Sequence, residues 1–133
     1  TVLAPTDAEY VRRRGADYAA FVARLRDAGV PHVAWLLGAP PAAWYAEEHH
    51  DQDWGLIDTE GINDTVRSLT EPDLCIIDFA GYIAGLEADG DHSLREDGLH
   101  LTADTARQVL DDHLGQQLID AALGSCPSTT GGA

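Results

Sequence analysis

The sequence contains no lysine, no methionine and no long hydrophobic run. Its eight basic residues are all arginine, they face 23 acidic residues, and the formal net charge is −15 at pH 7. A field of that sign repels phosphate groups, so we expect neither nucleic acid nor an anionic membrane surface as a partner. No apolar stretch approaches the roughly 20 residues of a membrane-spanning helix, so we expect no membrane insertion by this segment.

Cysteine is also scarce, with only Cys75 and Cys126. Two cysteines do not form a metal-binding pattern. Cys75 lies in an apolar run and Cys126 in a tail rich in Gly, Ser and Thr, so a disulfide between them and one from Cys126 to sequence outside this chain both stay open. The compartment stays open with them, whether extracytoplasmic, secreted or cytoplasmic. The first residues show neither Met nor the basic-then-apolar layout of a signal peptide, which suggests a fragment or a processed product.

What the sequence does contain is the periodicity of an α/β protein. With 133 residues and 44% hydrophobic residues it can bury one core, so we expect one domain or part of one. The patterns predict helices over residues 7–28, over 59–69 and from Thr102 onward, and buried strands over 32–37 and 74–79. Loops are expected over 39–58 and from residue 80 to the last helix, with a disordered tail over 124–133.

Each predicted helix has an apolar stripe. The expected inward positions are Val11, Tyr18, Phe21, Val22 and Leu25 in the first helix, and Ile62, Val66 and Leu69 in the second, with Thr59 as its N-cap. In the last helix they are Ala106, Val109, Leu110, Leu114, Leu118 and Ala121. The order helix–strand–helix–strand–helix predicts parallel strands joined by crossovers. Two strands cannot form a stable sheet covered on both faces, so we expect further strands from a preceding segment or a partner chain.

The most informative motif for function is Asp97-Gly98-Leu99-His100, which follows the second predicted strand and precedes the last helix. In open α/β sheets, sites form beyond the carboxyl ends of the strands. A carboxylate three residues before a histidine on a tight turn can reach Nδ1 and leave Nε2 free. That is the base and orienting acid of a catalytic triad. The competing interpretation is an ordinary Asp-Gly turn beside a helix start.

The segment from Arg95 to Leu118 resembles the final block of the SGNH (GDSL-type) hydrolases, in which Asp-x-x-His precedes the last helix. The strand ending in Gly-Ala-Pro-Pro, the helix carrying Ile62 and Asn63 and the strand ending in Ile-Asp-Phe fit the same family. The resemblance implies that residues 1–123 are the C-terminal part of a flavodoxin-like three-layer α/β/α domain with parallel strands, whose N-terminal strands are missing. It also implies that Asp97 and His100 are the acid and base of the triad.

The chain departs from that family in one essential respect. The Gly-Asp-Ser block with the nucleophile, and the Gly and Asn blocks of the oxyanion hole, are absent. None of Ser68, Ser93, Ser125 and Ser128 follows a first strand on a sharp turn, so none is assigned as nucleophile. We expect a preceding segment to carry the serine and the isolated chain to be nearly inactive, because triad members act as a unit.

Other residues are weaker candidates. Trp44 and Tyr45 lie in the loop after the first strand and are predicted to line an acyl or sugar pocket, or equally to cover the core edge. Arg95 is predicted to contact an anionic substrate group, with a surface ion pair to Glu96 or a neighbour as the default. Trp35 is expected in the core, Trp54 is unassigned, and Asn63 is expected to bond locally on its own helix. His32 and His113 are expected to be structural or solvent-facing, and His92 has no obvious partner.

The polar cluster Glu47, Glu48, His49, His50, Asp51 and Asp53 lacks the helical spacing of a zinc motif. We therefore expect a solvated acidic loop and neither a metal nor an organic cofactor. The function predicted by the resemblance is a serine esterase or deacylase acting on O-acyl esters, O-acetyl esters of glycans among them. Acyl transfer to a glycan, in a domain of the kind attached to membrane acyltransferases, and a non-catalytic binding module are the alternatives.

Overall fold

The computed structural model describes residues 3–49, 58–90 and 92–126. The chain begins with α1 (Ala8–Asp27), β1 (Val33–Leu36), α2 (Ala43–Glu48) and α3 (Thr59–Arg67). It continues with β2 (Leu74–Ile77), α4 (Phe79–Ala88), α5 (Ala103–Val109), the π-helical η2 (Leu110–Leu114) and α6 (Gly115–Ala122). This is a mixed helix-and-strand protein of the general α/β class.

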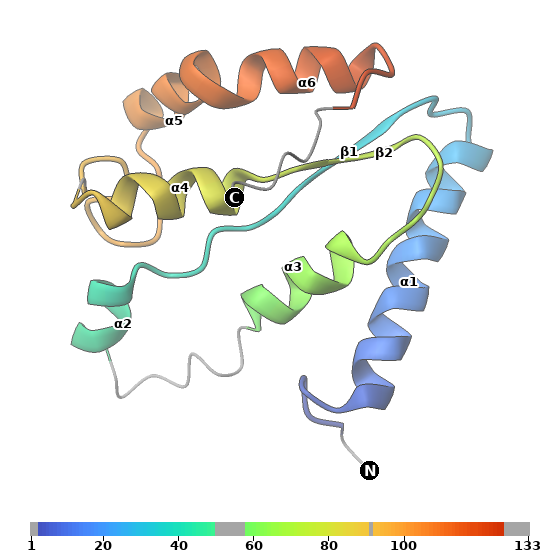
Figure 1. Cartoon of the computed structure of the whole chain (residues 1–133), viewed down its shortest axis with the longest axis horizontal. Helices are drawn as coiled ribbons and strands as arrows, with labels where there is room; N and C mark the ends of the chain where they lie inside the picture. Colours follow the sequence, from blue (N-terminus) through green and yellow to red (C-terminus); the bar gives the residue numbers. More distant parts are fainter. Residues whose placement is uncertain (1–2, 50–57, 91, 127–133) are drawn as a thin grey trace.

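The two strands form a parallel sheet, with Val33 opposite Leu74 and Leu36 opposite Ile77. Parallel neighbours need a crossover connection, which here includes α3. The strands lie between α5–α6 on one side and α1 and α3 on the other (Figure 1). The prediction of parallel strands joined by helices is therefore confirmed, in the form of one β-α-β unit.

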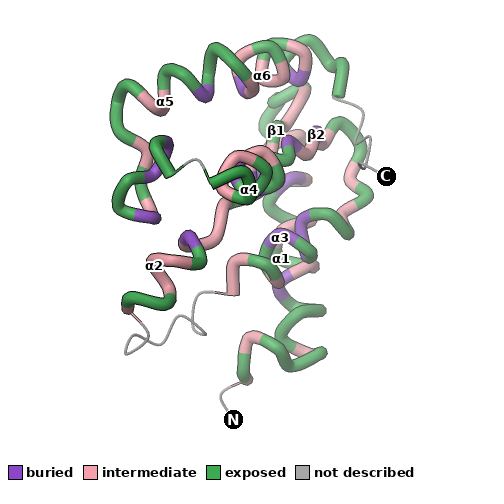
Figure 2. The backbone as a smooth tube through the Cα atoms, turned by 60° about the vertical axis from the view of Figure 1, so that its left-hand side comes forward, coloured by how far each residue is buried: buried purple, intermediate pink, exposed green. Residues whose placement is uncertain are grey.

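Helices pack against both faces of the sheet because successive strand residues point in opposite directions. Ile77 belongs to one buried cluster with Ile83, Leu94, Val109 and Leu114, which come from α4, its following loop and the C-terminal helices. Its neighbour Ile76 packs instead against the cluster of Leu37, Val66 and Ala80, together with Tyr18 of α1. Most positions of α1 and α5 are exposed or intermediate, and few are buried (Figure 2).

Some of the predicted inward positions are wrong. On α1 the buried residues are Arg14 and Val22, whereas Val11 and Phe21 are 39% and 48% exposed. The reason is that Arg14, Tyr18 and Val22, four residues apart, define the face toward α3 and the sheet. Phe21 lies at the edge of this face, with its ring centre 6.2 Å from that of Trp35. Trp35 is half-buried and packs at the core margin, less deeply than expected.

Two aspartates begin helices where the sequence suggested other arrangements. Asp58, not Thr59, is the N-cap of α3 and accepts a hydrogen bond from the Gly61 amide. Asp78 is the N-cap of α4 and accepts from the Gly81 amide. The predicted strand over 74–79 therefore ends at Ile77, and α4 replaces the first half of the predicted loop. The expected loop over 39–58 likewise contains α2.

The last helix begins as predicted at Thr102, which forms a capping box with Thr105. It is interrupted by the π-helical η2. The wider turn of η2 brings Val109 and Leu114, which are five positions apart, to the same buried face. Leu110, predicted to face inward, is 44% exposed for that reason. Gly115 closes the π turn by donating its N–H to the carbonyl of Leu110.

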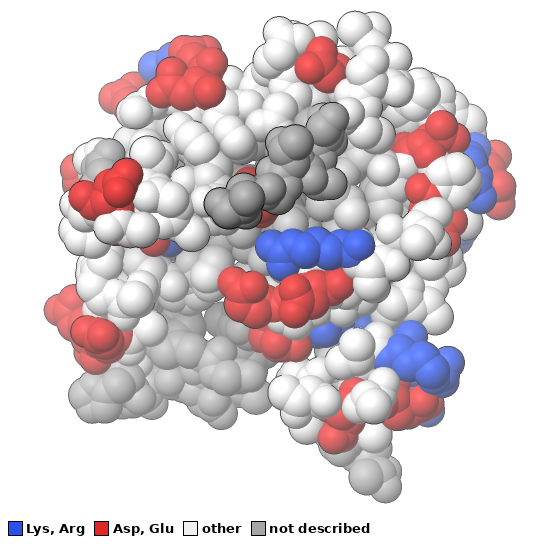
Figure 3. Space-filling view, viewed as in Figure 1, with Lys and Arg blue, Asp and Glu red and all other residues white. Residues whose placement is uncertain are grey.

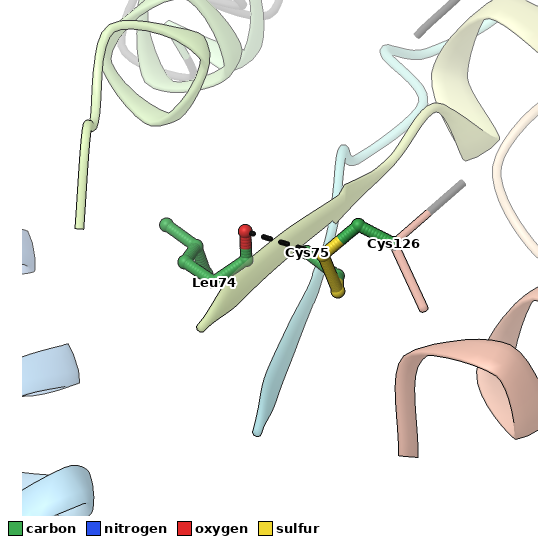
Figure 4. Close-up of a disulfide and its surroundings, with 3 residues drawn as sticks. All are labelled: Leu74, Cys75 and Cys126. Atoms are coloured by element: carbon green, nitrogen blue, oxygen red, sulfur yellow. Dashed lines mark hydrogen bonds between the residues drawn. A yellow bond between two sulfur atoms is a disulfide. The ribbon is translucent and has the colours of Figure 1, made fainter. Parts of the chain in front are cut away.

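Cys75 and Cys126 form a disulfide across 51 positions of sequence (Figure 4). It joins the buried centre of β2 to the residues after α6. The Cys126 sulfur lies 3.8 Å from the carbonyl oxygen of Leu74. This resolves the open question of cysteine pairing. It also shows that residues 124–126 are anchored, contrary to a disordered tail beginning at 124, while residues 127–133 lie outside the described part.

Arg14 is a buried charge that no sequence pattern indicated. Its guanidinium donates to the Thr65 hydroxyl at 2.9 Å, to the Asp58 carboxylate at 2.9 Å and to the Gly61 carbonyl at 2.6 Å. All three acceptors belong to α3 or its cap, so Arg14 joins α1 to α3. Because each nitrogen has a partner, the burial of this charge is compensated.

Acidic side chains are spread over the face shown in Figure 3, several of them beside a basic one. None of the helices in residues 3–49, 58–90 and 92–126 is both long and apolar enough to cross a membrane.

Candidate functional site

Asp97 and His100 meet on a tight turn between α4 and α5. The amide of Gly98 donates to the Arg95 carbonyl at 2.7 Å, which closes the turn. Gly98 has φ +74°, a left-handed conformation that favours glycine. The turn therefore depends on the Asp-Gly dipeptide that made this segment stand out in the sequence.

The Asp97 carboxylate uses both oxygens to organise the residues that follow it. Oδ1 accepts from the amides of Leu99 at 2.9 Å and His100 at 2.7 Å. Oδ2 lies 2.8 Å from Nδ1 of His100. The contact that the spacing suggested, carboxylate to Nδ1, is therefore present. The catalytic roles of the two residues remain a prediction.

The electrostatics of this contact fix the imidazole tautomer. The amide hydrogen bond from His100, the side-chain bond to the same residue and the amide of Leu99 hold the pKa of Asp97 well below its usual range. Asp97 is thus a carboxylate at neutral pH and can only accept, so Nδ1 of His100 carries the shared proton. In the neutral ring Nε2 then has a lone pair available to take a proton.

Both side chains are open to solvent, with His100 79% and Asp97 56% exposed. Within the described residues no serine hydroxyl bonds to the His100 imidazole. The arrangement is an imidazole with a carboxylate at its Nδ1, presented at the surface beside the start of α5. The Thr102–Thr105 capping box fixes that helix start two residues after His100.

The predicted aromatic residues come to this same turn. Gly98 is in such close contact with Tyr45 that a side chain at this position would overlap the Tyr45 Cβ, and Cη2 of Trp44 would lie 3.1 Å away. The Trp44 ring also meets that of His92 edge-on, with centres 5.7 Å apart. The structure therefore brings α2 against the Asp97–His100 turn. The pocket role of Trp44 and Tyr45 stays a prediction.

Arg95 occupies a different environment from the predicted one. It is 4% exposed, and its Nε and Nη2 both donate to Glu87 Oε1, at 2.8 and 2.6 Å. Its Nη1 donates to the carbonyl of Pro40 at 2.7 Å. The default ion pair is thus buried and formed with Glu87, not on the surface with Glu96. A guanidinium with all its nitrogens bonded inside the protein is poorly placed to contact a substrate anion.

The remaining candidates lie apart from the turn or have structural partners. Asn63 is buried and bonds to the segment after β1, donating to the Gly38 carbonyl at 2.8 Å and accepting from the Gly38 amide at 3.0 Å. The prediction that Asn63 bonds locally on its own helix is therefore wrong. His113 stacks on Tyr82 with ring centres 4.0 Å apart, so it is not simply solvent-facing. His32 packs against Gly124.

No group of three or more His, Cys, Asp or Glu side chains in the described ranges is arranged to hold a metal ion. His50, Asp51, Asp53 and Trp54 lie outside those ranges. Sequence reasoning missed Glu87 and the Pro40 carbonyl, which position Arg95. Their pairing joins residues eight and 55 positions apart, which no local pattern reveals.

Comparison with models of protein families, with curated proteins and with solved structures finds no match for this chain.

Proposed function

We propose that Asp97 and His100 are the acid–base pair of an SGNH-type serine esterase or deacylase. The supporting observation is the 2.8 Å contact between Asp97 Oδ2 and His100 Nδ1, made by a carboxylate whose other oxygen is bonded to two amides. The Asp-x-x-His resemblance supports the same assignment. His100 accepts a proton from a serine through Nε2 and returns it to the leaving alcohol, while Asp97 holds the tautomer and stabilises the imidazolium.

The proposed nucleophile belongs to a segment that precedes this chain. The imidazole is 79% exposed, which leaves room for a further segment to approach it. In this proposal β1 and β2 are two strands of a larger flavodoxin-like sheet. The preceding segment adds strands to that sheet and brings the serine and the oxyanion donors. Without them the pair lacks the group that attacks the ester.

The proposed substrate is an O-acyl ester, with O-acetyl esters of glycans as the first class to test. Trp44 and Tyr45 beside Gly98 provide aromatic surface near the pair, as a sugar or acyl group requires. Analysis of the products in the presence of a sugar acceptor separates hydrolysis from acyl transfer, because the same residues serve both reactions.

The test uses the full-length product of the gene and a chromogenic acetyl ester. His100→Ala should reduce kcat by a factor on the order of 10⁴ or more while leaving the circular dichroism spectrum unchanged. Asp97→Asn keeps the shape but favours the wrong tautomer, and we expect a loss approaching 10⁴-fold. His113→Ala is the matched control and should retain full activity. Full activity in His100→Ala would refute the assignment and favour a binding module.

A further inference from the structure

A buried arginine, Arg95, lies two residues before the exposed Asp97–His100 pair. The two side chains are 56% and 79% exposed, so few neighbouring side chains can restrain them directly. Their alignment must therefore come through the backbone of the turn at 95–98. Arg95 stands at the first position of that turn, since its carbonyl accepts the Gly98 amide at 2.7 Å.

The Arg95 side chain ties this position to two other parts of the fold. Both contacts to Glu87 reach α4, and the contact to the Pro40 carbonyl reaches the segment after β1. The side chains of Arg95 and Glu87 are 4% and 18% exposed, so the pair is shielded from solvent and its charges compensate each other. A planar guanidinium can donate in both directions at once, whereas an ammonium group is a point charge on a flexible stem.

The segment after β1 holds the turn at further points. The Ala42 amide donates to the Gly98 carbonyl at 2.9 Å, and Trp44 and Tyr45 pack on Gly98 itself. The turn is thus held both by Arg95 and by the residues at the start of α2. The contacts of Ala42, Trp44 and Tyr45 join the turn to a segment distant in sequence.

We propose that Arg95 is a positioning residue, which fixes the turn through Glu87 and Pro40 and thereby aligns Asp97 with His100. Its meaning for catalysis rests on the function proposed above, but the alignment itself is measurable without any activity. Arg95 would act on the reaction only through the turn and would not touch the substrate.

The experiment compares Arg95→Lys with Arg67→Lys in this chain. Arg67 forms an exposed ion pair with Asp64, so it controls for the loss of a guanidinium elsewhere. Nuclear magnetic resonance follows two signals, the titration of the Asp97 carboxyl carbon and the His100 Nδ1 proton. In Arg95→Lys we expect the Asp97 pKa to rise by about one unit and the Nδ1 proton to broaden by faster exchange. Arg67→Lys should change neither signal.

Trp44→Ala is an independent variant in case Arg95→Lys does not fold. It removes a ring that lies against Gly98 and should shift the same two signals in the same direction. Unchanged signals in folded Arg95→Lys or, if that variant does not fold, in Trp44→Ala would overturn the proposal, even if stability falls. In the full-length protein Arg95→Lys should lower kcat by about tenfold or more with KM within about twofold.

These readouts separate the two proposals. If the signals shift but His100→Ala keeps full ester-cleaving activity, the positioning role stands and the proposed function fails. If His100→Ala is inactive but Arg95→Lys leaves the signals and kcat unchanged, the function stands and the positioning role fails.

Discussion

The backbone of Gly115 lies so close to the carbonyl oxygen of Leu110 that a Cβ at position 115 would be 2.6 Å from that oxygen. This proximity follows from the π turn, in which the Gly115 N–H bonds to the carbonyl five residues earlier. Glycine is normally unfavourable inside a helix. Here it permits the π turn that carries Leu114 to the core.

Gly115→Ala should therefore destabilise the protein, against the usual helix propensity. We expect a loss of about 1–3 kcal/mol in the free energy of unfolding, as for an atom forced into a packed site. Gly85→Ala is the matched control, because a Cβ at that position of α4 meets nothing within 4 Å. It should stabilise the protein by about 0.5–1 kcal/mol. Urea denaturation of both variants measures the contrast, and equal effects would contradict the explanation.

The disulfide is expected to make a large contribution to stability. Closing a loop of 51 positions removes chain entropy from the unfolded state that corresponds to about 4 kcal/mol. Cys126→Ser should lower the free energy of unfolding by an amount of this order, and so should reduction of the wild type. Denaturation with and without reductant measures both. Reductant should leave Cys126→Ser unaffected, and a further loss there would point to another cause.

Substitution of Asn63 should destabilise the protein, because its side-chain amide both donates to and accepts from the backbone of Gly38. Asn63→Ala should lower stability by about 1–3 kcal/mol, since a buried amide is lost and two backbone groups lose their partners. The exposed Asp64→Ala is the control. Thermal unfolding followed by circular dichroism measures the difference, and comparable losses in the two variants would show that the bridge contributes little.

Asn63→Asp adds a pH dependence whose sign can be stated. A buried carboxyl beside the Gly38 carbonyl has its pKa raised in the folded state, because the neutral acid can donate to that oxygen. Its contribution is then fully present below the unfolded pKa of about 3.9 and is lost as the pH rises through the folded value. We expect the variant to lose stability relative to the wild type between mildly acidic and neutral pH. A constant difference across that range would contradict this.

Asp97 should behave in the opposite way. Its folded pKa is lowered by the amides and the imidazole that bond to it. The stability that it contributes is present above the ordinary carboxyl pKa of about 3.9 and is lost only as the pH falls well below that value. The Asp97 carboxyl carbon should still report an ionised group at pH 3.9. A midpoint at the ordinary value would show that the three bonds are not maintained in solution.

The sequence predicted most reliably those features that local patterns encode. The N-cap Thr102, the position of the strand around Trp35 and the contact between Asp97 and His100 all depend on residues close together in the chain. The predicted burial of that strand is wrong, because Ala34 and Leu36 are exposed. The sequence does not predict α4, because Phe79 lies only two residues after β2 and Gly81 and Gly85 favour a loop. The cap at Asp78 becomes visible only in the backbone geometry.

Features that depend on distant partners could not be predicted. Arg14 reads as one more charge on an amphipathic helix, and its burial follows from Asp58, 44 positions away. Arg95 beside Glu96 reads as a surface pair, and its true partners come from α4 and the segment after β1. Buried ion pairs of this kind produce no periodic pattern in the sequence. The same residue types at the same spacing are usually solvated.

Because Cys75 precedes the Asp97–His100 turn and Cys126 follows it, both candidate residues lie inside a covalently closed loop. A protease that cuts this loop once, for example beside the exposed Gly90, would leave the two pieces linked through sulfur. On an unreduced gel such a nicked molecule would migrate near the intact chain, and only reductant would separate its fragments. The two pieces that carry the candidate site therefore stay covalently joined after a single cleavage, which would separate them in a protein without the disulfide.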